Sequence, residues 1–115
     1  MIYLPKNTVI LDIRTPVEFC QGHLCGAINI PTPLPAGPGL PPLTNPQLRT
    51  LRSTLQSELT NIAHRRVHIA VYCKKGVRAG IAADILRKMG YQSVINLGGI
   101  LDEPLRYEEK CKCLI

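Results

Sequence analysis

Apolar residues in this chain form two kinds of pattern, short continuous runs and longer periodic stretches. Four runs lie at residues 8–14, 26–31, 67–73 and 93–97, and each contains valine or isoleucine. Such runs are typical of strands that are buried on both faces of a parallel sheet. We therefore expect four short strands, with Asp12 at the carboxyl end of the first.

Two stretches carry apolar side chains at helical spacing. Residues 45–65 predict an amphipathic helix that Asn45 caps, and residues 78–90 predict a second helix that Gly90 ends in a left-handed conformation. The positions that define these two stripes are Leu48, Leu51, Leu55, Leu59, Ile62, Ile81, Ala82, Ile85, Leu86 and Met89.

The elements read in chain order as strand, turn, strand, helix, strand, helix, strand and helix. The last helix is expected to begin near Asp102 in the tail, residues 102–115, and to fray by Cys111. Alternation of this kind predicts an α/β domain with a small, mainly parallel sheet flanked by helices, and 115 residues suit a single domain, 1–115. Sites in such sheets gather at the carboxyl ends of strands, and Cys73 directly follows one.

Residues 31–46 interrupt the alternation. This segment holds seven of the ten prolines, which remove backbone donors and fix φ, so we expect a surface loop with polyproline II character. Two functional alternatives stay open for it, a lid over the site or a ligand for an aromatic-lined groove.

The net charge of +6, from 14 lysines and arginines against 8 acidic residues, favours anionic partners. The basic residues are dispersed and accompany neither an aromatic stripe nor zinc-finger spacing. We therefore expect small anions as partners, and no nucleic acid. No apolar run reaches the roughly 20 residues that span a bilayer, so we expect no membrane association.

Five cysteines and the lack of a visible secretory signal lead us to expect a cytoplasmic protein with mostly free thiols. Cys20, Cys25, Cys111 and Cys113 do not have the spacing of a metal cluster, so no metal is expected. One of them could instead take sulfur from Cys73 or form a disulfide with it. Lys112 stands where prenylation would need a cysteine, which excludes that modification.

The loop after the third strand combines a thiol with cations. Cys73 leads into the helix near Arg78, where unpaired backbone amides form an anion-binding nest. We expect these amides to stabilise a thiolate. The candidate site therefore comprises Cys73 as nucleophile and the anion-binding residues Lys74, Lys75, Gly76, Val77 and Arg78. This chemistry fits sulfur transfer, phosphate ester hydrolysis or arsenate reduction.

Two stretches, residues 11–31 and 71–100, together 51 of 115 residues, closely resemble the rhodanese-like sulfurtransferases. The second stretch matches the family's active-site loop with the helix, strand and Gly-Gly turn that follow it. The first matches the family's signature residues, here Asp12, Arg14, Glu18, Phe19, Gly22, His23, Gly26 and Ala27.

The resemblance implies a three-layer rhodanese domain that needs no cofactor. It implies that Cys73 takes a sulfane sulfur from a donor such as thiosulfate, holds it as a persulfide and passes it to cyanide, a thiol or an acceptor protein. Four residues separate Cys73 from Arg78, whereas the family's cysteine phosphatases have five there, so the loop favours sulfur transfer over a phosphatase or arsenate reductase. A binding or sulfur-carrier module without turnover is the other alternative.

The polar residues of the first stretch are expected to be structural. Thr15 and Glu18 form a capping box, Arg14 and Glu18 can pair at a spacing of four, and His23 fixes a turn. The chain also lacks much of the strand and helix that precede Asp12 in the family, which leaves residues 1–4 as the only further strand. His64 and His68 receive no role.

Overall fold

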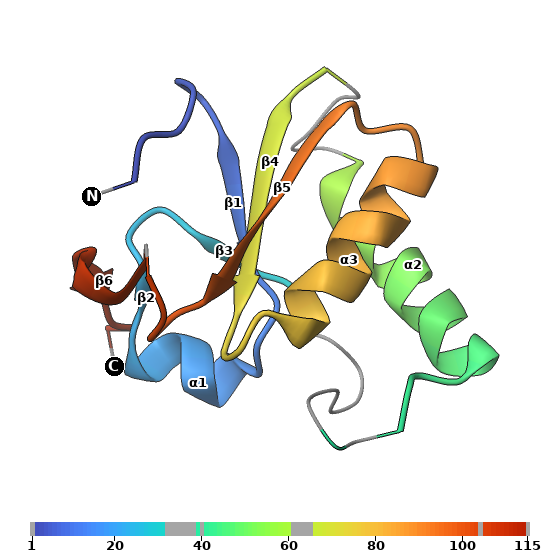
Figure 1. Cartoon of the computed structure of the whole chain (residues 1–115), viewed down its shortest axis with the longest axis horizontal. Coiled ribbons are helices and arrows are strands. Elements are labelled where there is room, and N and C mark those ends of the chain that lie inside the picture. Colours follow the sequence, from blue (N-terminus) through green and yellow to red (C-terminus); the bar gives the residue numbers. More distant parts are fainter. Residues whose placement is uncertain (1, 32–38, 40, 61–65, 104, 115) are drawn as a thin grey trace.

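A computed structural model describes residues 2–31, 39, 41–60, 66–103 and 105–114 of the chain. Its centre is a four-stranded sheet built from β1 (Val9–Asp12), β3 (Ile28–Asn29), β4 (His68–Cys73) and β5 (Ser93–Gly99). The spatial order is β3-β1-β4-β5 and every neighbouring pair is parallel (Figure 1). The predicted α/β class with a mainly parallel sheet is confirmed.

The central strand β4 shows why its sequence is continuously apolar. All its residues from Ile69 to Cys73 are buried, because both faces of the sheet are covered. Ile69, Val71 and Cys73 face one apolar cluster, and Ala70 and Tyr72 face the other. The period of two along a strand thus divides β4 between two half-cores.

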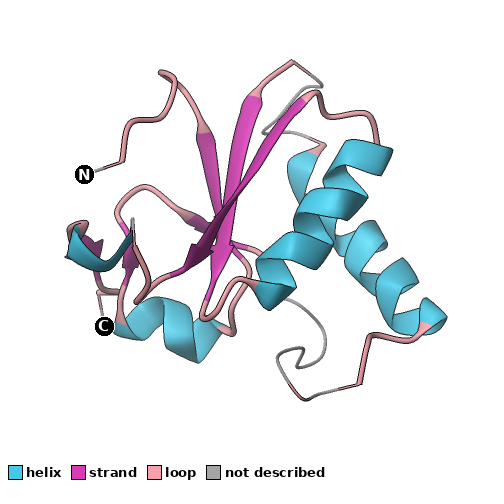
Figure 2. Ribbon diagram, viewed as in Figure 1, coloured by secondary structure: helices cyan, strands magenta, loops and turns pink. Residues whose placement is uncertain are grey.

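Two helices, α2 (Asn45–Leu59) and α3 (Val77–Lys88), cover one face of the sheet (Figure 2). The predicted apolar stripe of α2 is buried through Leu51, Leu55 and Leu59. The cap differs from the prediction by one residue: Thr44, not Asn45, accepts a hydrogen bond from the Gln47 amide in a capping box. Half of the proline-rich segment, residues 32–38 and 40, and the predicted end of α2, residues 61–65, lie outside the described residues.

The other face is covered by short elements. Helix α1 (Pro16–Gln21) begins with the predicted capping box of Thr15 and Glu18. Strands β2 (His23–Leu24) and β6 (Lys110–Cys111) form an antiparallel pair, beside the 3₁₀ turn η1 (Leu105–Tyr107). The predicted tail helix is therefore wrong, since the tail forms a 3₁₀ turn and a strand. Residues 2–4 form no strand either.

Two disulfides fasten the tail to the elements around α1. Cys20 is bonded to Cys113, and Cys25 to Cys111. The expectation of mostly free cysteines is wrong, because pairing of β6 with β2 brings the two tail cysteines next to Cys20 and Cys25. Among the described cysteines only Cys73 is free. Disulfides persist in oxidising compartments, so the cysteines lend no support to the predicted cytoplasmic location.

Within the described ranges, no helix combines the length and apolarity needed to cross a bilayer.

Candidate functional site

Cys73 lies where β4 ends and the chain turns into α3. Its side chain is 1% exposed, while the next two residues, Lys74 and Lys75, are exposed on a bend. Gly76 then takes a left-handed conformation with φ of 90° and caps α3, which begins at Val77. This conformation is easily adopted only by glycine, so the loop closes over the sulfur because residue 76 has no Cβ.

Backbone amides converge on the Cys73 sulfur. The N–H of Gly76 donates to Sγ at 3.0 Å and the N–H of Ala79 donates to it at 3.4 Å. Both donors belong to the first turn of α3 or its cap, where amides are unpaired and the helix dipole is positive. They stabilise negative charge on the sulfur. The sequence indicated the loop but missed the Ala79 amide, which follows from a helix that begins at Val77.

The end of β5 braces this loop from the side. The amide of Ile100 donates to the Cys73 carbonyl at 2.8 Å. Gly99 has no room for a side chain, since a Cβ there would overlap the Lys74 carbonyl and lie 2.6 Å from a carboxylate oxygen of Asp102. The Gly-Gly turn therefore fixes the backbone that carries Cys73.

Arg78, which was expected to bind an anion, is paired with a carboxylate of the protein itself. Its guanidinium pairs with the Glu18 carboxylate at 3.4 Å and joins α3 to α1. Burial alone would raise the pKa of Glu18, but the Thr15 amide and Arg78 outweigh it, and the pKa lies below its ordinary value of 4.5. The expected Arg14–Glu18 pair is absent because each partner binds another residue.

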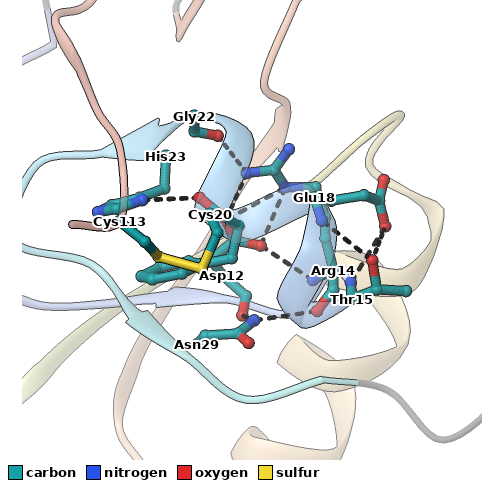
Figure 3. Close-up of a disulfide and its surroundings, with 10 residues drawn as sticks. Asp12, Arg14, Thr15, Glu18, Cys20, Gly22, His23, Asn29 and Cys113 are labelled. Carbon is teal, nitrogen blue, oxygen red and sulfur yellow. Dashed lines mark hydrogen bonds and ion pairs between the residues drawn. A yellow bond between two sulfur atoms is a disulfide. The ribbon is translucent and has the colours of Figure 1, made fainter. Parts of the chain in front are cut away.

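Arg14 instead completes a buried network with Asp12 (Figure 3). Its Nη2 donates to Asp12 at 2.6 Å and to the Gly22 carbonyl at 2.7 Å. The Tyr72 hydroxyl donates to the same carboxylate at 2.7 Å and accepts from the Leu24 amide at 3.0 Å. Burial, followed by the hydrogen bond to Asp12 and the negative charge of that carboxylate, raises the pKa of Tyr72. This network ties β1, β4 and β2 together, as expected for structural residues.

Neither of the two described histidines, His23 and His68, takes part in the Cys73 loop. His23 is buried, stacks on Phe19 with ring centroids 3.8 Å apart, and bonds the Phe19 carbonyl through Nδ1 at 2.8 Å. The predicted turn-fixing role is confirmed. His68 bonds Ser93 at the opposite end of β4 from Cys73, and His64 lies outside the described residues. In the part of the chain that the structure describes, no group of three possible metal ligands occurs.

A pocket of about 470 Å³ adjoins the loop. It contacts the loop at Lys74 and the bracing turn at Ile100 and Leu101, and Cys73 itself does not line it. The remaining walls come from the region of α1 and from the tail, namely Arg14, Glu18, Gln21, Gly22, Lys110 and Lys112. The spacing of residues in the sequence did not predict that Lys110 and Lys112 line this pocket, because the disulfides bring the tail there.

This parallel sheet, with a thiol held by helix-cap amides at its carboxyl edge, defines a rhodanese-type domain. The rhodanese-like domain model matches residues 4–102, and the chain belongs to that family. The relatives it resembles include sulfurtransferases.

Thiosulfate sulfurtransferase PspE of Escherichia coli is 32% identical over 92 residues, which are 80% of this chain and 70% of PspE. A putative mitochondrial thiosulfate sulfurtransferase of Schizosaccharomyces pombe is 30% identical over 110 residues, 93% of this chain and 68% of that protein. Two other relatives are longer, and the chain spans 58% and 52% of their lengths. Among solved structures, an E. coli rhodanese with anions superposes with a TM-score of 0.64 at 28% identity, over 92% of this chain and 99% of that one.

Proposed function

We propose that this protein is a sulfurtransferase that carries a sulfane sulfur on Cys73. The Cys73 thiolate attacks the outer sulfur of thiosulfate, a bond forms between the two sulfurs, and the electron pair of the broken S–S bond leaves with sulfite. An acceptor such as cyanide or a thiolate then attacks the sulfane sulfur and releases the Cys73 thiolate. No external oxidant or reductant is needed in either step.

The observation that carries this proposal is the pair of amides directed at the Cys73 sulfur, Gly76 at 3.0 Å and Ala79 at 3.4 Å. They favour the thiolate needed for attack and restored on transfer. The short loop from Lys74 to Arg78 adds exposed positive charge at Lys74 and Lys75, which favours an anionic donor. Its close fit around a single sulfur favours sulfur over a phosphate group.

The test is intact mass measured under non-reducing conditions after incubation with thiosulfate and removal of excess reagent. We expect a gain of one sulfur atom that cyanide removes as thiocyanate, and no gain in Cys73→Ser. A matched control replaces Cys20 and Cys113 with alanine and should still take up the sulfur. A gain that persists in Cys73→Ser would refute the proposal.

Steady-state turnover separates an enzyme from a passive sulfur carrier. We expect repeated turnover of thiosulfate with cyanide, whereas a carrier would load once and then stop. Cys73-dependent cleavage of an aryl phosphate, without sulfur uptake, would instead assign the loop to phosphate chemistry.

A further inference from the structure

The tail of this chain carries the sequence Lys110-Cys111-Lys112-Cys113 beside the candidate site. Side chains alternate in direction along an extended segment. Cys111 and Cys113 turn toward β2 and α1, where their disulfide partners Cys25 and Cys20 lie. The two lysines that alternate with them, Lys110 and Lys112, both line the pocket next to Lys74.

The pocket's charges do not cancel. Arg14 is compensated by Asp12, and Glu18 by Arg78. Lys110 is fixed in place by donating Nζ to the carbonyls of Leu105 and Glu108 at 2.8 and 2.6 Å, which leaves its charge unneutralised. Lys74 and Lys112 are exposed, and among the described residues neither has an ion-pair partner.

We propose that this disulfide-held tail is part of the acceptor site, and that its lysines with Lys74 bind the carboxylates of a small, acidic, peptide-like thiol. Thiosulfate has only five heavy atoms, whereas the pocket of about 470 Å³ is of the size that holds organic ligands. Ile100 and Leu101 supply an apolar wall for such a molecule. The inference rests on the proposed sulfur transfer, because the thiol would accept the sulfur held on Cys73.

The transfer step is a thiol exchange. The acceptor thiolate attacks the outer sulfur of the Cys73 persulfide, a new S–S bond forms on the acceptor, and the electron pair of the old bond returns to Cys73. Lys74 lies one residue from the nucleophile, and Ile100 donates its amide to the Cys73 carbonyl. A thiol held by its carboxylates in this pocket therefore starts next to the residue that carries the sulfur.

Two isosteric peptides test the idea, N-acetyl-Cys-Asp-Asp-amide and N-acetyl-Cys-Asn-Asn-amide. Protein loaded from thiosulfate is mixed with each peptide, and single-turnover transfer is followed by mass under conditions that leave both tail disulfides intact. Exposed ion pairs contribute up to about threefold to fivefold each, so the Asp peptide should react about tenfold faster at low salt. High salt should remove most of the difference.

Variants assign the preference to the tail. Lys112→Gln should lower the Asp-to-Asn rate ratio about threefold. Lys88→Gln, an exposed lysine at the far end of α3 from the loop, should leave the ratio unchanged. Replacing the Cys20 and Cys113 pair with alanine should also lower the ratio, because the segment carrying Lys112 then loses one anchor.

A separate measurement reads binding without sulfur chemistry. N-acetyl-Ser-Asp-Asp-amide, which cannot accept sulfur, is titrated while the amide resonances of Lys74, Leu101 and Lys112 are followed by NMR. Resonance shifts at these residues that N-acetyl-Ser-Asn-Asn-amide does not produce would support carboxylate binding in the pocket, even if Cys73 took no sulfur from thiosulfate. Equal rates for the two peptides, or a ratio that Lys112→Gln leaves unchanged, would overturn the assignment.

Discussion

Removing the two tail disulfides one at a time should cost far less stability than removing both. Cys20–Cys113 and Cys25–Cys111 span sequence separations of 93 and 86 residues, so either one alone closes nearly the whole chain into a loop. The perturbation is to replace both cysteines of one pair with alanine, then those of the other pair, then all four. Cys73 is retained throughout.

The nesting of the two bridges sets the expected magnitudes. Closing a loop of about 90 residues stabilises by about 4.6 kcal/mol in the chain-entropy model. With that loop closed, the second bridge closes only the small ring of about nine residues between the two pairs, which adds about 2.6 kcal/mol. Each single removal should therefore cost about 2.6 kcal/mol, and the double removal about 7 kcal/mol, because only then is the large loop opened.

Urea unfolding of the four proteins measures the cycle, with the same sucrose concentration in each sample so that the least stable variant stays folded. Thiol titration in urea should find one reactive group in the wild type, namely Cys73. Losses that simply add would contradict the nested geometry. A wild type as unstable as the four-alanine variant, or one with five reactive thiols, would show that the bridges do not form.

Two further predictions concern the Cys73 loop and its link to α1. Gly99→Ala should displace the Lys74 carbonyl, lower the free energy of unfolding by about 1–3 kcal/mol and slow sulfur uptake by Cys73 more than tenfold. In the control Gly80→Ala, the new Cβ would meet only Asn96 at 3.5 Å. This variant should retain sulfur uptake and gain up to about 1 kcal/mol in the free energy of unfolding. The rate of sulfur uptake is followed by mass spectrometry of quenched samples, and urea unfolding measures the stability of both variants. Equal effects of the two substitutions would contradict the role of Gly99 in bracing the loop. Because the pKa of Glu18 is lowered in the folded protein, its carboxylate contributes stability above pH 4.5 that is lost as the pH falls through the folded pKa. The difference in unfolding free energy between wild type and Glu18→Gln should therefore shrink below pH 4.5, and a constant difference down to pH 2.5 would count against the pairing with Arg78.

Local patterns predicted the individual strands of the sheet, α3 and the capping box of α1, because each of these elements is encoded by residues close together in the chain. The run 67–73 had to be a buried strand, and the glycine at 76 had to allow a tight loop. The prediction of a helix in the tail was wrong because the tail's structure is not encoded by nearby residues. Its fold depends on pairing between His23 and Cys111, 88 positions apart, and no local pattern encodes that contact.

The same long-range pairing explains why the number of cysteines led to the wrong prediction of mostly free thiols. An odd total indicated free thiols, yet one cysteine is reserved for the loop and the other four form two bridges. The cysteines at 20 and 25 and those at 111 and 113 lie on two segments joined by the antiparallel pairing of β2 with β6, and this arrangement brings them together as two pairs. Because lysines alternate with the tail cysteines, the bridges that stabilise the fold also hold Lys110 and Lys112 at the pocket that adjoins the Cys73 loop. If the tail lysines bind the acceptor as proposed, reduction of one bridge, which should cost only about 2.6 kcal/mol, should change which acceptor the proposed Cys73 persulfide serves before the sheet unfolds.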